Sequence, residues 1–337
     1  MRLLVTGGAG YIGSIAHRVF LDAGHEVVVL DSLERGHRAA VDSRATLVIA
    51  SAGDADVLDA ILPGTDAVVH FAGYIDVAES VREPELYHEK NVREPSVLLD
   101  RVIAAGVRRF VFSSTAAVYG EPRRVPIPED AAIAPINPYG ESKAEFERLL
   151  MAAEEHGVLR SVRLRYFNVA GAWPDGSVGE AHPTETHIVP RLLRAAGGGA
   201  HGGGLAGPEN SPRFTVFGDD YPTPDGTCVR DYVHVVDLAK AHLAAVEYLT
   251  AGGVGTVCNL GSGRGYSNLE VVKACADVTG REIEVVPGPR RDGDPAMLVA
   301  AVERARKVLG WIPERDLTTM VADAWRWHQG HPEGYGR

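Results

Sequence analysis

The chain of 337 residues has few cysteines and no long hydrophobic run. Its three cysteines, Cys228, Cys258 and Cys275, form no Cys-x-x-Cys pair, so the sequence encodes neither a disulfide framework nor a cysteine zinc site. No stretch of about 18 apolar residues could cross a membrane, and glycines begin at Gly7, too early for a signal peptide. We therefore expect a soluble cytoplasmic protein without a bound metal or a membrane partner.

Positive charge is also scarce. The 34 Lys and Arg residues are outnumbered by 45 Asp and Glu residues, which gives a formal net charge of −11, and no dense basic run occurs. Proteins that bind phosphate backbones or anionic membrane surfaces do so with clustered Lys and Arg. The composition therefore argues against a nucleic-acid partner and against a membrane surface.

Glycine, in contrast, is abundant, with 38 residues. The length corresponds to about two domains. In the first half, short apolar runs alternate with helical patterns, as expected when helices cover both faces of a parallel sheet. We predict a doubly wound α/β sheet of the Rossmann type with a smaller C-terminal α/β lobe. The predicted strands span 3–6, 26–31, 47–50, 67–71, 109–113 and 161–165, and the predicted helices span 11–23, 54–62, 84–105 and 138–155.

The pattern loosens after residue 168. Further helices are expected near 190–196, 235–249 and 269–279, with a closing element at 311–328. The segment 195–212 is so rich in glycine that we expect a mobile surface loop there.

A glycine-rich turn follows the first predicted strand. It places Gly7, Gly10 and Gly13 in a Gly-x-x-Gly-x-x-Gly pattern directly before an amphipathic helix. A dinucleotide site needs glycines here because the strand turns tightly and the backbone approaches a pyrophosphate at the helix N-terminus. The pattern alone is weak, but a strand before it, a helix after it and an acid ending the second strand make it specific. This context predicts a dinucleotide site.

The acid that ends the second strand is Asp31, eighteen residues after Gly13. A carboxylate at this position binds the adenosine ribose and repels a 2′-phosphate, which favours NAD over NADP, although Arg35 lies close by. The alternative is that Asp31 is an acidic turn residue. Asp54 could reach the adenine edge or cap the next helix, and spacing does not separate the two.

A second constellation begins the helix 138–155. Tyr139 and Lys143 are four residues apart and share one helical face, so the ammonium should lower the pKa of the phenol toward that of a general base. Thr115, at the end of a predicted strand, is the candidate substrate-facing hydroxyl, whereas Ser113 and Ser114 could simply finish that strand. For an isolated Tyr-x-x-x-Lys, a packed tyrosine and a solvated lysine would be the better interpretation.

Together these motifs resemble the extended short-chain dehydrogenase/reductase family, and within it the UDP-galactose 4-epimerase branch. Segments 70–73, 166–168, 217–234 and 290–294 carry the more specific part of the resemblance. It implies an NAD-binding domain at 1–168 with a returning segment near 232–262, and a UDP-sugar-binding lobe at 169–231 and 263–337. Relatives usually form homodimers through helices like 84–105 and 138–155.

The resemblance also implies site residues. The cofactor residues would be Gly7, Gly10, Tyr11, Ile12, Gly13, Asp31, Ser32, Asp54, Ala55, Phe71, Ala72, Gly73, Asn91, Ser113, Tyr139, Lys143 and Tyr166. The substrate residues would be Thr115, Tyr139, Asn168, His187, Arg191, Phe217, Arg230, Arg291 and Asp294. Arginines suit a diphosphate because each can form two hydrogen bonds to it. Without the family pattern, Arg230 beside Asp231 and Arg291 beside Asp292 would be interpreted as surface ion pairs.

The implied reaction is inversion at C4 of a UDP-sugar. Tyr139 takes a proton from the 4-hydroxyl, NAD accepts and returns the hydride, and Thr115 bonds the same oxygen. UDP-glucose and UDP-galactose are the default pair. A UDP-glucuronate and UDP-galacturonate pair is the alternative if Arg191 meets the carboxylate, although a solvated arginine is the simpler interpretation. An N-acetylhexosamine is a third option, because Leu298, or else Met297, stands where some relatives carry a bulky tyrosine.

Some positions depart from the family. Ile75 stands where many close relatives have lysine, and Val169 replaces a usual proline. Two rival functions remain, a net sugar-nucleotide oxidoreductase or dehydratase and a non-catalytic dinucleotide sensor. Dehydratases commonly have an acid pair after the active threonine, where this chain has Ala116 and Ala117. A sensor should lack the proton-transfer residues that are present here.

Overall fold

The computed structural model describes residues 1–197, 213–291 and 293–336. Within them, a seven-stranded parallel sheet has the order β10-β6-β5-β4-β1-β2-β3. Its strands are β1 (Arg2–Thr6), β2 (Glu26–Asp31), β3 (Thr46–Ile49), β4 (Ala67–His70), β5 (Arg109–Thr115), β6 (Arg160–Tyr166) and β10 (Thr256–Leu260). The order reverses between β1 and β4, which confirms the predicted doubly wound fold.

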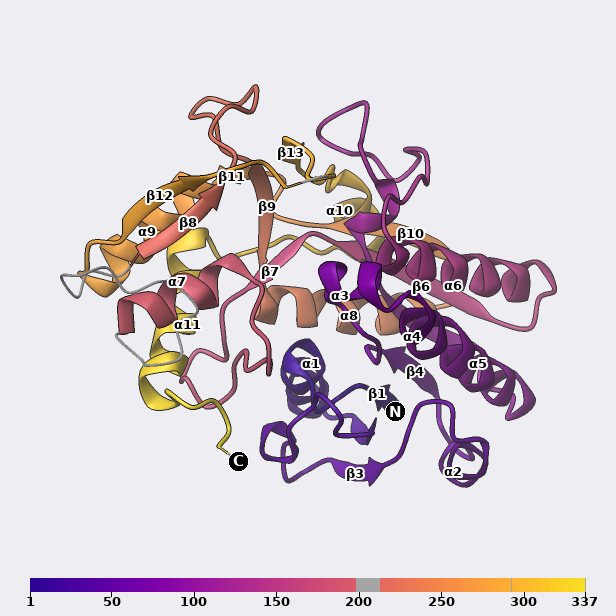
Figure 1. Ribbon diagram of the computed structural model, residues 1–337. Coiled ribbons are helices and arrows are strands. Elements are labelled where there is room, and N and C mark those ends of the chain that lie inside the picture. The colour runs from indigo at the N-terminus through magenta and orange to yellow at the C-terminus, as the bar shows by residue number, and fades with distance from the viewer. Residues whose placement is uncertain (198–212, 292, 337) are drawn as a thin grey trace.

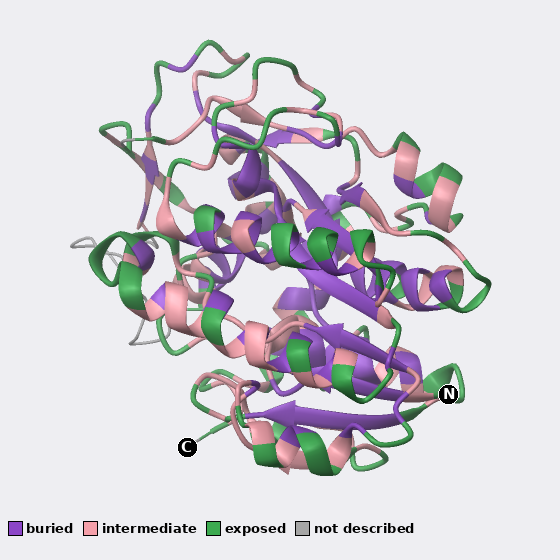
Figure 2. Ribbon diagram, turned by 90° about the vertical axis from the view of Figure 1, so that its right-hand side faces the viewer, coloured by how far each residue is buried: buried purple, intermediate pink, exposed green. Residues whose placement is uncertain are grey.

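Helices cover both faces of this sheet (Figure 1). On one face α1 (Tyr11–Asp22) packs beside α8 (Val235–Thr250), and on the other lie α2 (Ala55–Ile61), α5 (Glu94–Ala104) and α6 (Pro138–Glu155). Side chains alternate between the two cores along each strand. Leu3 and Val5 of β1 join the α1/α8 core, whereas Leu4 joins the other. Figure 2 shows the buried strands between helices that are exposed on their outer sides.

The predicted helix 84–105 is interrupted. The structure divides it into α4 (Pro84–His88), a π-helical turn η2 (Glu89–Arg93) and α5. Pro95 explains the break, because it has no N–H to donate to the preceding turn and its ring crowds that turn. The π turn buries Asn91, whose amide bonds both the N–H and the C=O of Tyr74 at 2.7 and 3.0 Å.

A smaller lobe contains strands that the sequence analysis did not predict. One small sheet joins β7 (Asn168–Ala170), β9 (Val229–His234), β11 (Gly265–Ser267) and β13 (Met297–Leu298), and another pairs β8 (Arg213–Phe217) with β12 (Glu284–Gly288). Their core is shared with α7 (Ile188–Gly197), α9 (Asn268–Thr279) and α11 (Leu317–Gly330). Between β9 and β11 the chain returns to the large sheet through α8 and β10. Shorter helices are η1 (Arg38–Ala40), α3 (Val77–Arg82), η3 (Ala116–Tyr119) and α10 (Glu303–Leu309).

The sequence analysis made predictions about the glycine-rich segment 195–212 and about membrane-spanning helices. Most of the glycine-rich segment 195–212 lies outside the described residues, except for its first three positions, which end α7. Among the described helices, none is both long and apolar enough to cross a membrane.

A buried ion pair holds together the elements that carry the predicted catalytic residues. Arg165 of β6 donates to Glu147 of α6 at 2.9 Å, and the Ser114 hydroxyl of β5 donates to the same carboxylate. Arg165 also donates to the Tyr119 hydroxyl at 3.0 Å. Since both charged side chains are about 95% buried, at 6% and 4% exposure, this network fixes α6 against β5 and β6.

Replacing Glu147 by Ala should lower the free energy of unfolding by about 3–5 kcal/mol, because the Arg165 charge would stay buried without its partner. Urea unfolding followed by circular dichroism measures the loss. The control is Glu155→Gln at the exposed end of the same helix, which should change stability by less than about 0.5 kcal/mol. A loss below about 1 kcal/mol in Glu147→Ala would contradict this role.

Candidate active site

A cavity of about 400 Å³ opens at the carboxyl ends of the parallel strands. Its wall is formed by the segments after β1, β2, β3, β4, β5 and β6, together with residues of β7, residues 179–182 and His187. Doubly wound sheets bind ligands at this edge, where the strand order reverses. The wall includes these predicted residues: Gly7, Gly10, Tyr11, Ile12, Gly13, Asp31, Ser32, Phe71, Ala72, Gly73, Thr115, Tyr139, Tyr166, Asn168 and His187.

The glycine turn is built for close backbone contact. A Cβ on Gly7, which has φ +71°, would lie 2.4 Å from the backbone nitrogen of Ala72, and one on Gly13 would lie 2.2 Å from the carbonyl of Gly7. The helix α1 starts at Tyr11 with no side-chain cap from Gly10. Its first N–H groups therefore have no side-chain partner and border the cavity, which suits a pyrophosphate.

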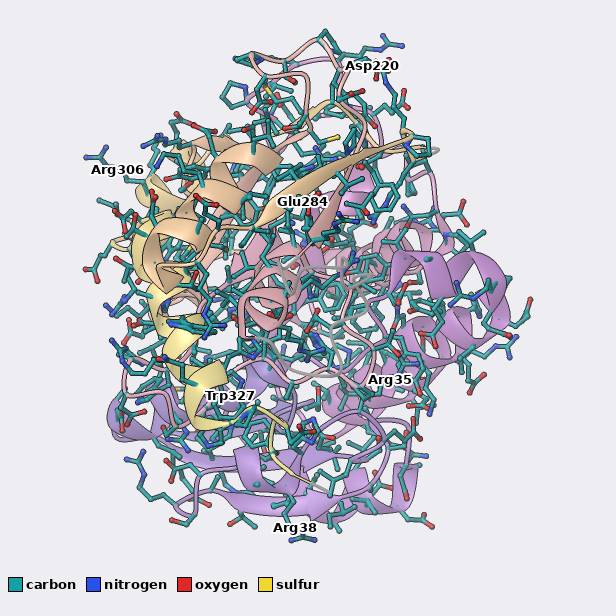
Figure 3. All side chains as sticks on the ribbon, turned by 60° about the vertical axis from the view of Figure 1, so that its left-hand side comes forward. Arg35, Arg38, Asp220, Glu284, Arg306 and Trp327 are labelled. Carbon is teal, nitrogen blue, oxygen red and sulfur yellow. The ribbon has the colours of Figure 1, made fainter. Side chains whose placement is uncertain are left out.

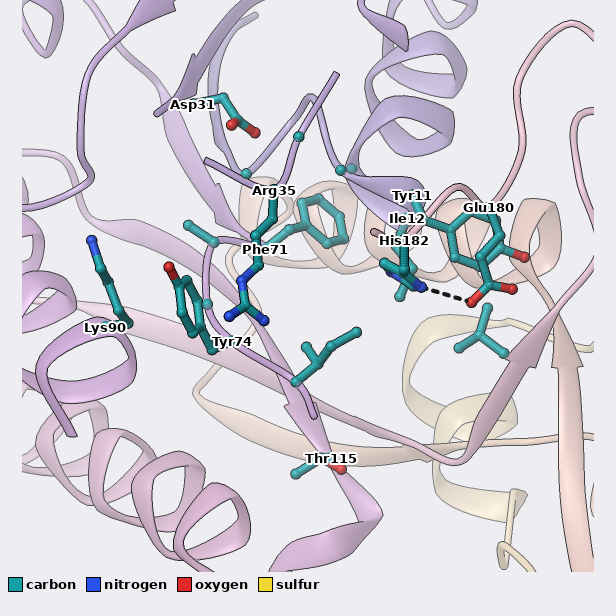
Figure 4. Close-up of a pocket in the computed structure, with 18 of the residues that line it drawn as sticks. Tyr11, Ile12, Asp31, Arg35, Phe71, Tyr74, Lys90, Thr115, Glu180 and His182 are labelled. Carbon is teal, nitrogen blue, oxygen red and sulfur yellow. Dashed lines mark ion pairs between the residues drawn. The ribbon is translucent and has the colours of Figure 1, made fainter. Parts of the chain in front are cut away.

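Asp31 lies at the end of β2, on the cavity wall (Figure 4). Its carboxylate accepts the N–H groups of Ala9 and Leu33, both at 2.9 Å. Burial raises the pKa of this carboxyl, and the two N–H groups oppose that rise. The nearby Arg35 guanidinium stacks on the Tyr74 ring at 3.6 Å and pairs with Glu79 at 2.7 Å. Because the charge of Arg35 is already balanced, the geometry favours NAD over a cofactor with a 2′-phosphate.

Five predicted cofactor residues are not part of the wall that the described residues form. Asp54 caps α2 by accepting the Val57 N–H at 3.2 Å, which is one of the two roles left open for it, and Ala55 begins that helix. The other three, Asn91, Ser113 and Lys143, are buried. Their contacts with a cofactor stay predictions.

The predicted catalytic residues lie close together. Thr115 ends β5, while Tyr139 and Lys143 share a face of α6, and all three are less than 10% exposed. The Lys143 ammonium donates to the Ser113 carbonyl at 3.1 Å and lies 4.9 Å from the centre of the Phe112 ring. The Thr115 oxygen accepts the Ala117 N–H at 3.1 Å, which leaves its proton for Tyr139. The arrangement can exchange a proton with a hydroxyl in the cavity.

The pKa of Tyr139 differs from the prediction. Burial raises it above the usual value, and the hydrogen bond from Thr115 only partly opposes that rise. The sequence argument considered the charge of Lys143 and omitted desolvation, which dominates for a phenol inside the protein. Burial also lowers the pKa of Lys143 to about 8, against the opposing effect of Glu147. In the ligand-free chain the site therefore disfavours both charged forms.

The other predicted substrate residues lie beyond the wall formed by the described residues. Arg230 forms an ion pair with Asp294. Arg230 is also the sheet neighbour of Leu298 in β13, and Leu298 lines the cavity. The guanidinium of Arg291 lies 4.1 Å from the centre of the Phe217 ring. Asp292, the alternative partner considered for Arg291, lies outside the described residues.

Arg191, which the uronate alternative would need near the sugar carboxylate, is not among the described residues that line the cavity. Its guanidinium lies 5.3 Å from the centre of the Phe214 ring. Burial lowers its pKa, and the charge of Arg291 lowers it further, so the two arginines are neighbours.

A polar cluster beside Tyr11 was missed. Glu180, His182, Glu185 and His187, which we name the loop cluster, precede α7, and three of them line the cavity. Although burial opposes it, the contact of the imidazole with the Glu180 carboxylate and the nearby negative charge of Glu185 raise the pKa of His182 to about 9. The spacing His-x-x-Glu-x-His was visible in the sequence, but only His187 was considered.

Three comparisons with known proteins agree with this geometry. The family model for the NAD dependent epimerase/dehydratase family matches residues 3–261. A UDP-glucose 4-epimerase of Lacticaseibacillus casei is 48% identical over 339 residues, covering 100% of this chain and 99% of that protein. The chain belongs to the NAD dependent epimerase/dehydratase family. Membership in this family confirms the resemblance inferred from the sequence.

Solved structures of similar family members cover the whole fold. A crystal structure of a UDP-glucose 4-epimerase has a TM-score of 0.93 and 41% identity, with 100% of both chains covered. The enzyme from Stenotrophomonas maltophila, with bound NAD and formylated UDP-arabinopyranose, has a TM-score of 0.93 and 38% identity, covering 98% of this chain and 99% of its own.

Because Lys143 is buried, this member of the epimerase/dehydratase family should be less stable below pH 8 than at higher pH. Its pKa falls from 10.5 in the unfolded chain to about 8, which corresponds to a cost on the order of 3 kcal/mol while both forms are protonated. That cost disappears as the pH rises from about 8 to 10.5. In the cofactor-free protein, Lys143→Met should therefore be more stable than the parent at pH 7.

Unfolding free energies measured across this pH range test the assignment. The parent and the surface control Lys240→Met should gain stability as the pH rises, and Lys143→Met should lack that gain. Parallel curves for all three proteins would show that Lys143 is not the cause.

Proposed function

We propose that the protein is an NAD-dependent UDP-hexose 4-epimerase, which inverts C4 of a UDP-sugar through a transient 4-keto intermediate, with UDP-glucose and UDP-galactose as its default pair. The observation that carries this proposal is the group of Thr115, Tyr139 and Lys143 at the edge of a dinucleotide cavity. Similarity to UDP-glucose 4-epimerases over the full length supports the same reaction.

The residues around the cavity fit NAD. The uncapped start of α1 offers N–H groups to the pyrophosphate, Gly7 and Gly13 leave room for it, and Asp31 faces the adenosine side. When bound, NAD+ accepts a hydride from C4 and returns it to the opposite face, so that no net oxidation occurs.

The chain supplies the proton chemistry. Tyr139 as phenolate takes the proton of the 4-hydroxyl and later returns it, while Thr115 hydrogen-bonds the same oxygen. Since burial disfavours the phenolate, a positive charge must offset the desolvation. Lys143, one helical turn along α6, supplies that charge from inside the protein.

We assign the diphosphate of the UDP group to the smaller lobe. Arg191 and Arg291 lie close enough for one charge to lower the pKa of the other, and neither has a carboxylate within 4.0 Å among the residues that the structure describes. An anion with two charges would relieve this repulsion. Arg230, with its partner Asp294, would contact the nucleotide next to the wall residue Leu298.

This assignment weakens the uronate alternative. Arg191, the arginine that would bind the sugar carboxylate, is assigned to the diphosphate together with Arg291. An N-acetylhexosamine has more support, since Leu298, and not Met297, is the one of the two that lines the cavity. A leucine there leaves more room than a tyrosine would. The dehydratase rival lacks support, because Ala116 and Ala117 line the wall beside Thr115.

We also propose domain boundaries, a cytoplasmic location and a homodimeric state. We take residues 1–168 with the returning segment 232–262 as the NAD-binding domain and 169–231 with 263–337 as the substrate lobe of a cytoplasmic enzyme. A homodimer through α4, α5 and α6 is supported by exposed apolar side chains on α6 and the neighbouring α3, namely Leu149, Met151 and Val81.

Replacing Tyr139 by Phe should reduce turnover of UDP-glucose by about 10²- to 10⁴-fold, because the proton of the 4-hydroxyl would have no acceptor. Proton NMR of UDP-galactose formation without added NAD measures the rate. Tyr248→Phe on α8 is the control and should keep the parent rate. Bound NAD, released by heating and quantified, should be similar in all three proteins. A Tyr139→Phe rate above about one tenth of the parent rate would reject this role.

Replacing Arg191 by Ala should raise the KM for UDP-glucose and for UDP-glucuronate by a similar factor, about 10- to 100-fold, since the lost hydrogen bonds go to a charged diphosphate. The exposed Arg306→Ala is the control. A loss confined to UDP-glucuronate would instead support the uronate alternative and contradict the diphosphate assignment.

A further inference from the structure

The loop cluster gathers four potential metal ligands in one place. Glu180, His182, Glu185 and His187 come from a single segment between β7 and α7, and one ligand atom from each lies within 4.8 Å of all the others. Figure 4 shows the imidazole of His182 directed toward the carboxylate of Glu180, beside Tyr11. Two imidazole nitrogens and two carboxylate oxygens are a donor set that zinc accepts.

The spacing of these atoms resembles that of a tetrahedral site. Glu180 Oε1 lies 2.6 Å from His187 Nδ1 and 3.1 Å from His182 Nδ1. Glu185 lies 3.3 Å from His187 Nδ1 through one oxygen and 3.5 Å from His182 Nδ1 through the other. Bonds of about 2.0–2.1 Å to a central zinc ion place tetrahedral ligand atoms about 3.3–3.4 Å apart. Three of the four distances, at 3.1, 3.3 and 3.5 Å, lie near that value, whereas the 2.6 Å contact between Glu180 and His187 is a hydrogen bond that would lengthen on metal binding.

A second observation points to a ligand. The side chain of Glu185 is only 2% exposed, yet its Oε2 atom has no hydrogen-bond partner among the described residues. A buried carboxylate oxygen without a donor is costly, and native structures rarely leave one. Its nearest cationic atom in the cluster, His182 Nδ1, is 3.5 Å away, which is too far for a good hydrogen bond.

The segment that carries the loop cluster contacts three other parts of the chain. The ring of His182 meets that of Tyr11 edge-on at 6.3 Å, next to the glycine turn. The indole N–H of Trp327 donates to the carbonyl of Glu180 at 3.0 Å, and Figure 3 shows Trp327 where α11 meets the N-terminal part. The imidazole of His37, on the loop after β2, lies 2.8 Å from the carbonyl of Ala181. The segment thus joins three separate parts of the chain at the cavity wall.

We propose that the loop cluster binds one divalent cation of the zinc class, through His182, His187, Glu180 and Glu185, as a closed structural site that holds the cavity wall against Tyr11 and α11. Four protein ligands leave no open position, as is typical of structural rather than catalytic zinc sites. The expectation of no metal considered only cysteine ligands and overlooked the His-x-x-Glu-x-His spacing. The site does not depend on the proposed reaction.

The test measures metal directly. The full-length protein is equilibrated with zinc, passed over a desalting column and analysed for zinc per chain. The parent and the control His156→Gln, at the exposed end of α6, should retain about one zinc ion. His182→Gln and Glu185→Gln should bind it at least about 10- to 100-fold more weakly, the range known for loss of even an outer-shell partner. Cobalt(II) substituted into the parent should give the visible absorption of a tetrahedral site.

Stability gives an independent measurement. If the cluster binds zinc only in the folded state, the melting temperature of the parent rises with free zinc and falls after chelation, whereas that of His182→Gln does not respond. Should a variant fail to fold, the parent's zinc content and cobalt spectrum decide the question. A parent that retains no zinc, or variants that retain as much as the parent, would overturn the proposal and leave a cluster of ion pairs. Epimerisation by a zinc-free parent would leave the proposed function standing.

Discussion

The close approach of backbone at the glycine turn is the constraint on which the rest of the site depends. A single carbon atom on Gly7 would collide with Ala72 after β4, and one on Gly13 would collide with Gly7 itself. This close approach holds the segment after β1 against the segment after its neighbour β4, at the point where the strand order reverses. The uncapped start of α1 follows this turn directly, and the N–H of Ala9 in the turn binds the carboxylate of Asp31.

Burial of Tyr139 and Lys143 shifts the pKa values on which the proposed proton transfer depends, and burial of the Lys143 charge also lowers the free energy of unfolding. Lys143 and Tyr139 lie inside the protein, where burial disfavours the charged form of each side chain. In the proposed reaction, bound substrate and cofactor must offset this cost of desolvation. The neighbouring Glu147 and Arg165 pair keeps α6 in place despite that cost. The proposed proton-transfer group Tyr139 and the residues Lys143 and Glu147 therefore lie on one helix, in the first, second and third turns of α6.

Local sequence patterns predicted six of the seven strands of the large sheet, all but β10, and predicted a dinucleotide site at its carboxyl edge, where the cavity opens. Parallel strands buried on both faces are apolar throughout, and the Gly-x-x-Gly-x-x-Gly turn and Tyr-x-x-x-Lys pair have fixed spacings, so short segments sufficed. Effects that depend on packing could not be predicted in this way. The short strands of the smaller lobe, the raised pKa of Tyr139 and the proximity of Arg191 to Arg291 depend on how distant segments pack together. The break before Pro95 is instead a local effect, which the proline in the sequence could have indicated. The loop cluster is different, because its spacing was present in the sequence and was overlooked.

The central claim is that one site removes a hydride from C4 and returns it to the same carbon from the other side. Incubation with UDP-glucose that carries deuterium at C4, followed by NMR of the products, tests this claim most directly. The account predicts UDP-galactose that keeps the deuterium at C4, with none lost to water. Formation of UDP-galactose with solvent hydrogen at C4, or the absence of any C4 epimer, would contradict it.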